Sequence, residues 1–413
     1  MINRALNDHF DIAIVGGGVV GLTLANLLTQ DNDNSTFIPR IALIEANPPK
    51  KHSGINDQLR VSAVGPAAKN ILSRANIWGL LQKDDYCPYL NMHVYQKGIQ
   101  DKDTREIKFS SSELGVKELG HIVSNFALRE AAWSNLAALK KVEFITSYPP
   151  NHLEKIDGYW EIKFASGTNI KSRLIIGADG IHSWVRQSIG LEINRINHNQ
   201  TAIVAEIESE HPHNYTAHQN FLPSGPVAFL PLANGHCSMV WTCEKKTAEE
   251  LLAVDIKKFS SQLEDSMGKL LGELRCVSKR MSFSLASANL KSYTGRRFAL
   301  IGDAAHQVHP LAGQGLNLGI LDAASLAENL KTHLQLNEAD PGDYLVLRRY
   351  ERARKSNNII TQKVLMGLNS IFTNADSAFL GGIGLNILDK ATPIKNLLAR
   401  YAMGQFSQPP ISK

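Results

Sequence analysis

The stretch that decides the fold is Asp11-Ile-Ala-Ile-Val-Gly-Gly-Gly-Val-Val-Gly21. Its apolar run predicts a buried strand, and Gly16, Gly18 and Gly21 fit the pattern G-x-G-x-x-G, which leads a strand into a helix. The first glycine permits a tight turn, the second lets a pyrophosphate approach the backbone, and the third lets the helix pack on the strand. A second apolar run ends at Glu45, whose carboxylate can accept hydrogen bonds from a ribose diol. The stretch therefore predicts binding of an unphosphorylated adenine dinucleotide, either NAD or FAD.

Bulk composition narrows the class of protein. A chain of 413 residues exceeds what one hydrophobic core usually supports, so we expect two domains. The net charge of +5, without a basic stripe, does not indicate a nucleic-acid partner. The four cysteines form no C-x-x-C pair and are typical of free thiols in a reducing compartment. No signal-peptide pattern and no run of about 18 apolar residues is present, so we expect a cytoplasmic protein.

Two later motifs also follow predicted strands. Asp179-Gly180 ends one strand, although such a pair also serves as a turn or a helix cap. Gly302-Asp303 ends another strand, and Gly313 and Gly315 then open a helix predicted over residues 315–331. The free amides of a glycine-opened helix suit the electron-rich edge of a reduced flavin. An NAD-dependent dehydrogenase, the main alternative, would leave both motifs without a role.

The three motifs in this order resemble the flavin-dependent aromatic hydroxylases, over roughly residues 10–400. Shorter segments resemble the ubiquinone-biosynthesis hydroxylases in particular, and most closely the bacterial members that hydroxylate C5 of a polyprenylphenol ring, followed by those that act on C6. These segments are Gln58-Leu-Arg-Val-Ser-Ala63, Gly120-His-Ile-Val-Ser-Asn125, Ala228-Phe-Leu-Pro-Leu232 and Arg348-Arg-Tyr-Glu-Arg-Ala-Arg354.

The resemblance implies a para-hydroxybenzoate hydroxylase-like α/β fold. It consists of a Rossmann-like FAD-binding domain, an inserted β-sheet substrate domain and a helical C-terminal region. The FAD-binding domain would comprise residues 1–85, 126–190 and 282–340, the substrate domain residues 86–125 and 191–281, and the C-terminal region residues 341–413. Within the substrate domain we expect a hairpin at residues 227–243 and one helix over residues 247–274.

The resemblance also assigns residues to the cofactor. Those expected to bind FAD are Gly16, Gly18, Gly21, Glu45, Arg60, Arg129, Asp179, Asp303, Pro310, Gly313, Gly315, Leu316 and Asn317. For Arg60 and Arg129 the alternative is a surface ion pair.

Candidates for contact with the reacting ring are fewer. His309 and Pro310 lie in the loop expected beside the flavin ring. His306 and His309 form H-x-x-H, but no third ligand follows at a familiar spacing, so we expect no metal. Phe229, Pro231 and Trp241 could line an apolar substrate site, with ordinary sheet core as the alternative for each.

The chemistry implied by the resemblance is monooxygenation. NAD(P)H would reduce FAD, a flavin C4a-hydroperoxide would form with O₂, and an electron-rich polyprenylphenol ring would attack its distal oxygen. A halogenase, a prenyl reductase and a non-catalytic FAD-binding subunit are alternatives on the same fold. Contact with other ubiquinone-biosynthesis proteins, homo-oligomerisation and peripheral contact with the inner membrane stay open.

Overall fold

We describe the fold from a computed structural model, which describes residues 7–30, 38–49, 59–96, 105–146, 148–308, 314–336 and 339–373. One sheet carries the glycine motif and has the strand order β18-β19-β11-β1-β2-β8, with β10 and β9 added beside β11. Its strands are β1 (Asn7–Val15), β2 (Ile41–Glu45), β8 (Val142–Thr146), β9 (Pro150–Ile156), β10 (Tyr159–Phe164), β11 (Asn169–Gly177), β18 (Thr294–Gly295) and β19 (Phe298–Leu300). The central strand β1 pairs in parallel with both β11 and β2.

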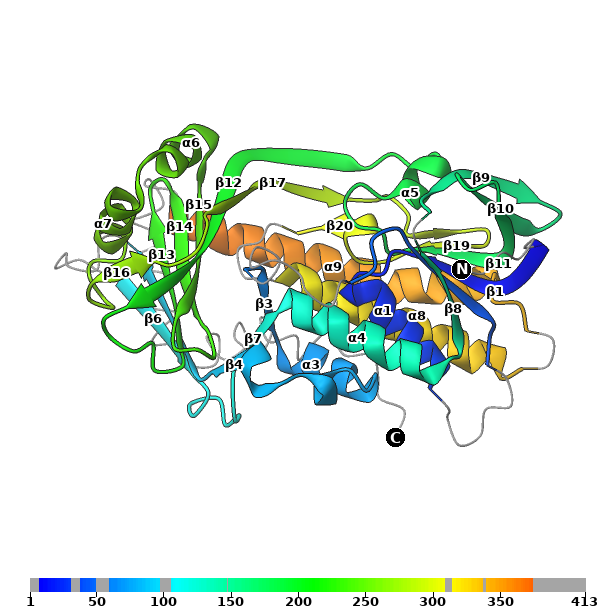
Figure 1. Cartoon of the computed structure of the whole chain (residues 1–413), viewed down its shortest axis with the longest axis horizontal. Helices are drawn as coiled ribbons and strands as arrows, with labels where there is room; N and C mark the ends of the chain where they lie inside the picture. The colour runs from blue at the N-terminus through cyan, green and yellow to red at the C-terminus, as the bar shows by residue number, and fades with distance from the viewer. Residues whose placement is uncertain are drawn as a thin grey trace.

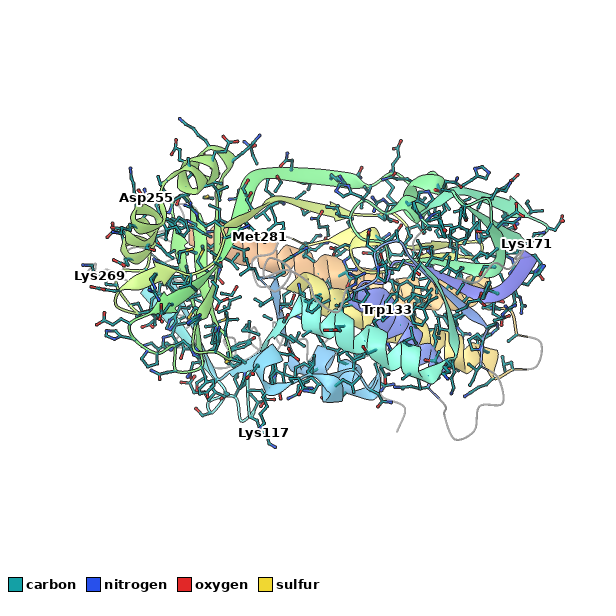
Figure 2. All side chains as sticks on the ribbon, viewed as in Figure 1. Lys117, Trp133, Lys171, Asp255, Lys269 and Met281 are labelled. Atoms are coloured by element: carbon teal, nitrogen blue, oxygen red, sulfur yellow. The ribbon has the colours of Figure 1, made fainter. Side chains whose placement is uncertain are left out.

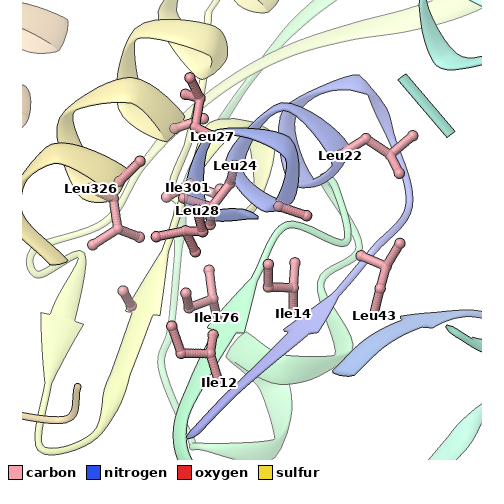
Figure 3. Packing of buried hydrophobic residues seen from close by; sticks show 14 of the residues in the cluster. Ile12, Ile14, Leu22, Leu24, Leu27, Leu28, Leu43, Ile176, Ile301 and Leu326 are labelled. Atoms are coloured by element: carbon pink, nitrogen blue, oxygen red, sulfur yellow. The ribbon is translucent and has the colours of Figure 1, made fainter. Parts of the chain in front are cut away.

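Long helices cover one face of this sheet (Figure 1). They are α1 (Val19–Thr29), α4 (Asn125–Leu139), α8 (Gln314–Leu334) and α9 (Tyr344–Thr373). Figure 3 shows Leu24 and Leu28 of α1 and Leu326 of α8 around Ile12 and Ile176 of the strands. All five side chains are essentially inaccessible to solvent. Because burial of each is worth about 2 kcal/mol, this core fixes the carboxyl ends of β1 and β11 beside each other.

A second sheet, of order β20-β17-β12-β15-β14-β13-β5-β6 with β16 beside β12, forms the inserted domain. The long antiparallel pair β12 and β17 runs from this sheet toward the first one (Figure 1). The strands of this second sheet are β5 (Asn91–Gln96), β6 (Arg105–Ser110), β12 (Asn194–Ser209), β13 (Thr216–Leu222), β14 (Gly225–Pro231), β15 (Cys237–Glu244), β16 (Leu274–Cys276), β17 (Met281–Asn289) and β20 (His306–Gln307).

Two helices, rather than the single one expected over residues 247–274, cover the outer side of this sheet (Figure 1). They are α6 (Lys245–Ala253) and α7 (Ile256–Ser266). The chain breaks between them because the Asp255 side chain accepts a hydrogen bond from the Lys258 amide at 2.9 Å and caps α7. Asp255 is labelled on this outer side in Figure 2. After α7 the chain turns into the short strand β16, so the predicted single helix is wrong.

A small sheet of β3 (Val61–Val64), β7 (Gly120–Ser124) and β4 (Tyr86–Tyr89) lies between the two larger sheets (Figure 1). The remaining short elements are α3 (Pro66–Arg74), α5 (Trp184–Ser188), η1 (Trp78–Leu80), η2 (Lys83–Asp85) and η3 (Gly302–Ala304). No helix in the described part of the chain is long and apolar enough to cross a membrane.

A buried histidine in the second sheet predicts loss of stability in mild acid. Burial, reinforced by the nearby His93 and His213, lowers the pKa of His218 from 6.5 to about 4. The unfolded chain therefore binds more protons than the folded one between these pH values, and stability falls as pH falls through this window. We expect His218 to contribute on the order of 2 kcal/mol to that loss. Urea unfolding measures the free energy of unfolding at pH 7 and at pH 5. The difference between the two values should be smaller for His218→Gln than for the wild type, whereas His211→Gln, a change at an exposed position, should match the wild type. An equal difference for His218→Gln and the wild type would contradict this.

Candidate functional site

The glycine turn after β1 has two tight positions and one open one. Gly16 has φ +110°, and a Cβ there would lie 2.4 Å from the Ala178 carbonyl oxygen. A Cβ on Gly21 would lie 2.1 Å from the carbonyl oxygen of Gly16. By contrast, no described atom lies within 4 Å of the position that a Cβ on Gly18 would take. Gly16 and Gly21 are thus needed for packing, whereas Gly18 borders free space at the N-terminus of α1, where an anion is favoured.

Glu45 and Arg129 hold this turn from the next strand and from α4. Glu45 Oε2 accepts a hydrogen bond from the Gly17 amide at 2.7 Å and lies 3.3 Å from Arg129 Nη2. Arg129 Nε donates to the Gly17 carbonyl at 2.7 Å, and its Nη2 donates to the Asn47 carbonyl at 2.6 Å. Arg129 therefore does more than form a surface ion pair with Glu45, because it also holds the backbone at Gly17 and at Asn47.

The Asp179-Gly180 motif lies directly against this turn. The Ala178 backbone and the Asp179 amide are the atoms that a Cβ on Gly16 would strike. Asp179 Oδ2 accepts from the Val185 amide at 3.0 Å, while its buried Oδ1 has no hydrogen-bond partner among the described residues. Burial raises the pKa of this carboxyl, although nearby donors, such as Ser183 and the Val185 amide, lower it. A buried carboxylate oxygen without a partner is the kind of group that a ligand hydroxyl can satisfy.

Arg186, which our sequence reasoning did not assign, connects the second motif to the third. Its side chain is 2% exposed. Its Nη1 donates to the Ala304 carbonyl at 3.0 Å, and its Nη2 donates to the Ile181 carbonyl at 2.7 Å. The Asp179-Gly180 loop and the Gly302-Asp303 turn are therefore held together by one buried guanidinium.

Asp303 is accessible to solvent, whereas Gly302 and Ala304 on either side of it are buried. Desolvation by the surrounding protein nevertheless raises the pKa of Asp303, and charge from His306 and Arg60 lowers it. The accessible region around Asp303 is called the hollow from here on. Arg60 lies beside this hollow, with its guanidinium 4.9 Å from the ring centre of Phe283 on β17.

The first turn of α8 contains three of the residues predicted to bind FAD, namely Gly315, Leu316 and Asn317. A Cβ on Gly315 would meet no described atom within 4 Å, and Leu316 is half-buried. The Asn317 side chain is 5% exposed; it accepts from the Gly65 amide and donates to the Ala63 carbonyl, at 3.0 and 2.8 Å. Its side-chain amide thus joins α8 to β3 and to the N-terminus of α3. His309, Pro310 and Gly313 lie outside the described residues.

The predicted substrate residues lie in or beside the core of the second sheet. Phe229 and Trp241 belong to the core that the sheet forms with α6 and α7, and Trp241 lies 6.2 Å from the Phe259 ring of α7. Pro231 is buried on the same strand as Phe229, two residues further on. Because side chains alternate along a strand, all three point to the helix-covered face. The alternative of ordinary sheet core therefore describes them.

Two further observations concern a possible metal ion and a buried carboxylate. Among the described residues, no group of three His, Cys, Asp or Glu side chains could hold a metal ion. Asp322, a buried carboxylate on α8, was missed in the sequence, although a charge within an apolar helix is itself a signal of a specific partner.

The groups at these positions are of the kinds that bind an adenine dinucleotide. Gly18 leaves room for a pyrophosphate at the N-terminus of α1, and Glu45 closes the next strand where a ribose would lie. Asp179 Oδ1 and the accessible Asp303 offer acceptors for hydroxyl groups further along.

Comparison with known proteins gives the same picture. A family model described as an FAD binding domain matches residues 152–359. The chain is 33% identical to ubiquinone hydroxylase UbiL of Rhodospirillum rubrum, over 97% of this chain and 91% of that protein. It is 30% identical to 3-demethoxyubiquinol 3-hydroxylase of Escherichia coli, over 96% of this chain and 99% of that protein.

Solved structures agree on the fold. The chain superposes on p-nitrophenol 4-monooxygenase PnpA of Pseudomonas putida with a TM-score of 0.76 at 17% identity, over 97% of this chain and 98% of that one. It superposes on Klebsiella pneumoniae HpxO, solved with FAD and uric acid, with a TM-score of 0.73 at 18% identity, over 99% and 100% of the two chains. The predicted para-hydroxybenzoate hydroxylase-like fold is confirmed, and the chain belongs to the ubiquinone-biosynthesis hydroxylases, a family of FAD-dependent monooxygenases.

Proposed function

We propose that this protein hydroxylates C5 of a polyprenylphenol ring, with NAD(P)H as reductant and O₂ as co-substrate. The observation that supports the FAD-dependent part of the proposal is that the three motifs lie against one another. Gly16 packs on Ala178, and Arg186 joins the Asp179 loop to the Gly302-Asp303 turn. The family membership of the chain and the subfamily segments in its sequence support the substrate class.

The residues around the hollow have distinct tasks in holding FAD. Gly18 and the N-terminus of α1 would receive the pyrophosphate, and Glu45 the adenosine ribose. Asp303, with Arg60 beside it, would bind the ribityl and phosphate region. The free amides at Gly315 and Leu316 would face the electron-rich edge of the ring, where negative charge develops on reduction. Bound FAD supplies electron transfer and oxygen activation, which no side chain provides.

The face of the second sheet opposite α6 and α7 offers a wall for the substrate ring. Cross-strand neighbours on β14, β15, β12 and β17 form an apolar row there: Ala228, Val240, Val204 and Met281. Three of these side chains are half-buried, and Val204 is 9% exposed. Such a row can exclude water from the reacting ring, which suppresses side reactions of activated oxygen. We propose this row in place of Phe229, Pro231 and Trp241, and keep His309 and Pro310 as candidates at the reaction centre.

The location follows from the substrate. A polyprenyl tail partitions into a bilayer, so we propose a cytoplasmic enzyme in peripheral contact with the inner membrane.

Deletion of the gene in its host tests the ring position. We expect a prenylated intermediate that lacks the C5 oxygen to accumulate, and expression of the wild-type chain to remove it. The retained oxygens can be assigned by mass spectrometry and NMR of the extracted quinones. Accumulation of an intermediate that lacks the C6 or the C1 oxygen would overturn the C5 assignment. A strain complemented by a variant that binds FAD but oxidises no NAD(P)H would instead support a non-catalytic FAD-binding subunit.

A further inference from the structure

A buried carboxylate on α8 lies directly beneath the turn that presents Asp303. Asp322 is 0% exposed. Its Oδ2 accepts from the Gly302 amide at 3.1 Å and lies 2.5 Å from His306 Nε2. Its Oδ1 accepts from Arg354 Nε at 2.8 Å and from Asn358 Nδ2 at 3.3 Å. One side chain thus joins α8 to the turn on one side and to α9 on the other.

Asp322 is held in its charged form. Burial alone would raise the pKa of this carboxyl, but His306 and Arg354 lower it to about 2. The compensating guanidinium of Arg354 is itself 2% exposed. A buried ion pair of this kind is seldom worth much as net stability, because desolvation of both charges opposes their attraction. It does fix a geometry, because either charge left alone is strongly unfavourable.

The geometry that it fixes is that of the turn Gly302–Ala304. Gly302 adopts φ +57°, a conformation that favours glycine, and its amide is held by Asp322. The other end of the turn is held by Arg186 at the Ala304 carbonyl. Between these two anchors, Asp303 is exposed to solvent. A change at Asp322 would therefore move Asp303 without touching the hollow itself.

We propose that Asp322 is a positioning residue for FAD, and that Arg354 and Asn358 make α9 part of the flavin site. The proposal rests on FAD binding at the hollow. It assigns a role to the subfamily segment that ends at Arg354, whose buried end reaches Asp322 from the helix that follows the FAD-binding domain.

A second buried carboxylate on α9 provides a matched control. Glu351 is 3% exposed and accepts from Thr294 Oγ1 at 2.7 Å and from Ser292 Oγ at 3.0 Å. It also pairs with Arg348 Nη1 at 2.8 Å. It therefore ties α9 to β18 in the same way, but its described contacts do not reach the Gly302–Ala304 turn. Glu351→Gln should cost stability comparable to that lost in Asp322→Asn while leaving the turn in place.

The test compares FAD affinity with stability. FAD is titrated into apoprotein and followed by flavin fluorescence, and the melting temperature of each apoprotein is measured in parallel. We expect the dissociation constant for FAD to rise by about tenfold or more in Asp322→Asn and to stay within about twofold of wild type in Glu351→Gln, at similar melting temperatures. Equal losses of FAD affinity in both variants would overturn the proposal, because the carboxylate would then act only through general stability.

A milder pair of variants covers the case in which Asp322→Asn does not fold. Arg354→Lys keeps the positive charge beside Asp322, whereas Arg354→Gln removes that charge and leaves the carboxylate with His306, Asn358 and the Gly302 amide. We expect FAD affinity to fall in the order wild type, Arg354→Lys, Arg354→Gln; equal affinities in all three would overturn the proposal.

Amide hydrogen exchange of the apoproteins separates this proposal from the proposed function. We expect residues 302–306 to exchange faster in Asp322→Asn than in Glu351→Gln, without any need for bound cofactor. If the wild type bound no FAD, the proposed function would fail, and faster exchange of the turn would still show that Asp322 fixes it. Equal exchange in the two variants would overturn the positioning role itself.

Discussion

Gly18→Val apoprotein is expected to fold normally and to bind FAD about 100-fold more weakly than the wild type. A Cβ at this position meets no described atom within 4 Å apart from its own chain neighbours, so we expect a valine side chain to occupy the space that the pyrophosphate needs. Gly18 is the N-cap of α1 and has φ −77°, which any residue can adopt. The loss of a glycine N-cap should therefore lower the free energy of unfolding by less than about 1 kcal/mol. Fluorescence titration with FAD and thermal unfolding of the apoprotein measure the two effects separately.

Gly21→Ala is the matched variant, for which we expect a loss of stability of the apoprotein. Its Cβ would lie 2.1 Å from the Gly16 carbonyl oxygen, so α1 must move away from β1. We expect the apoprotein to lose about 3 kcal/mol of stability, because the clash involves backbone that cannot rotate aside. If Gly18→Val lost stability as Gly21→Ala does, or kept full FAD affinity, the space beside Gly18 would not be the pyrophosphate site.

Arg186→Met is expected to lose about 3 kcal/mol of stability together with most of its FAD affinity. The buried guanidinium is a donor to both the Ile181 and the Ala304 carbonyls, and methionine leaves these acceptors without that partner. The same change separates the Asp179 loop from the turn that presents Asp303. Chemical denaturation and the FAD content of the purified protein are the measurements.

Arg195→Met controls for the loss of a single arginine. Arg195 Nη2 also donates to the Ile181 carbonyl at 2.7 Å, but at an exposed position and without a link to Ala304. We expect a change of less than about 0.5 kcal/mol and normal FAD content, as for most surface substitutions. Similar losses in both variants would mean that the link between the two motifs is not what Arg186 contributes.

Features that depend on short-range pattern could be predicted from the sequence. The glycine spacing around Gly16, Gly18 and Gly21 fixes a turn whose sterics are local, and the contacts of Gly16 and Gly21 agree with the roles expected of them. The acid Glu45 follows from the end of the next strand. The fold class followed from the order of three motifs, because few architectures bring three such loops to one sheet edge.

Features that depend on tertiary contacts could not be predicted from the sequence. The facing direction of Phe229 and Trp241 is set by where α6 and α7 pack, and alternation along a strand is the same for either face. Arg186 and Asp322 act on carbonyls and amides of distant segments, and backbone partners leave no mark in a sequence. Asn317 looked like a ligand residue, yet its amide is used to join α8 to Gly65 and Ala63.

Isotope labelling tests the central claim most directly. FAD-loaded protein is mixed with NAD(P)H, a polyprenylphenol and oxygen-18 gas, and the extracted ring product is examined by mass spectrometry. We expect one labelled oxygen atom in the ring product and consumption of NAD(P)H that increases when the phenol is added. NAD(P)H oxidation that yields only hydrogen peroxide, or a ring oxygen that comes from water, would contradict the assignment of this chain as a ring hydroxylase.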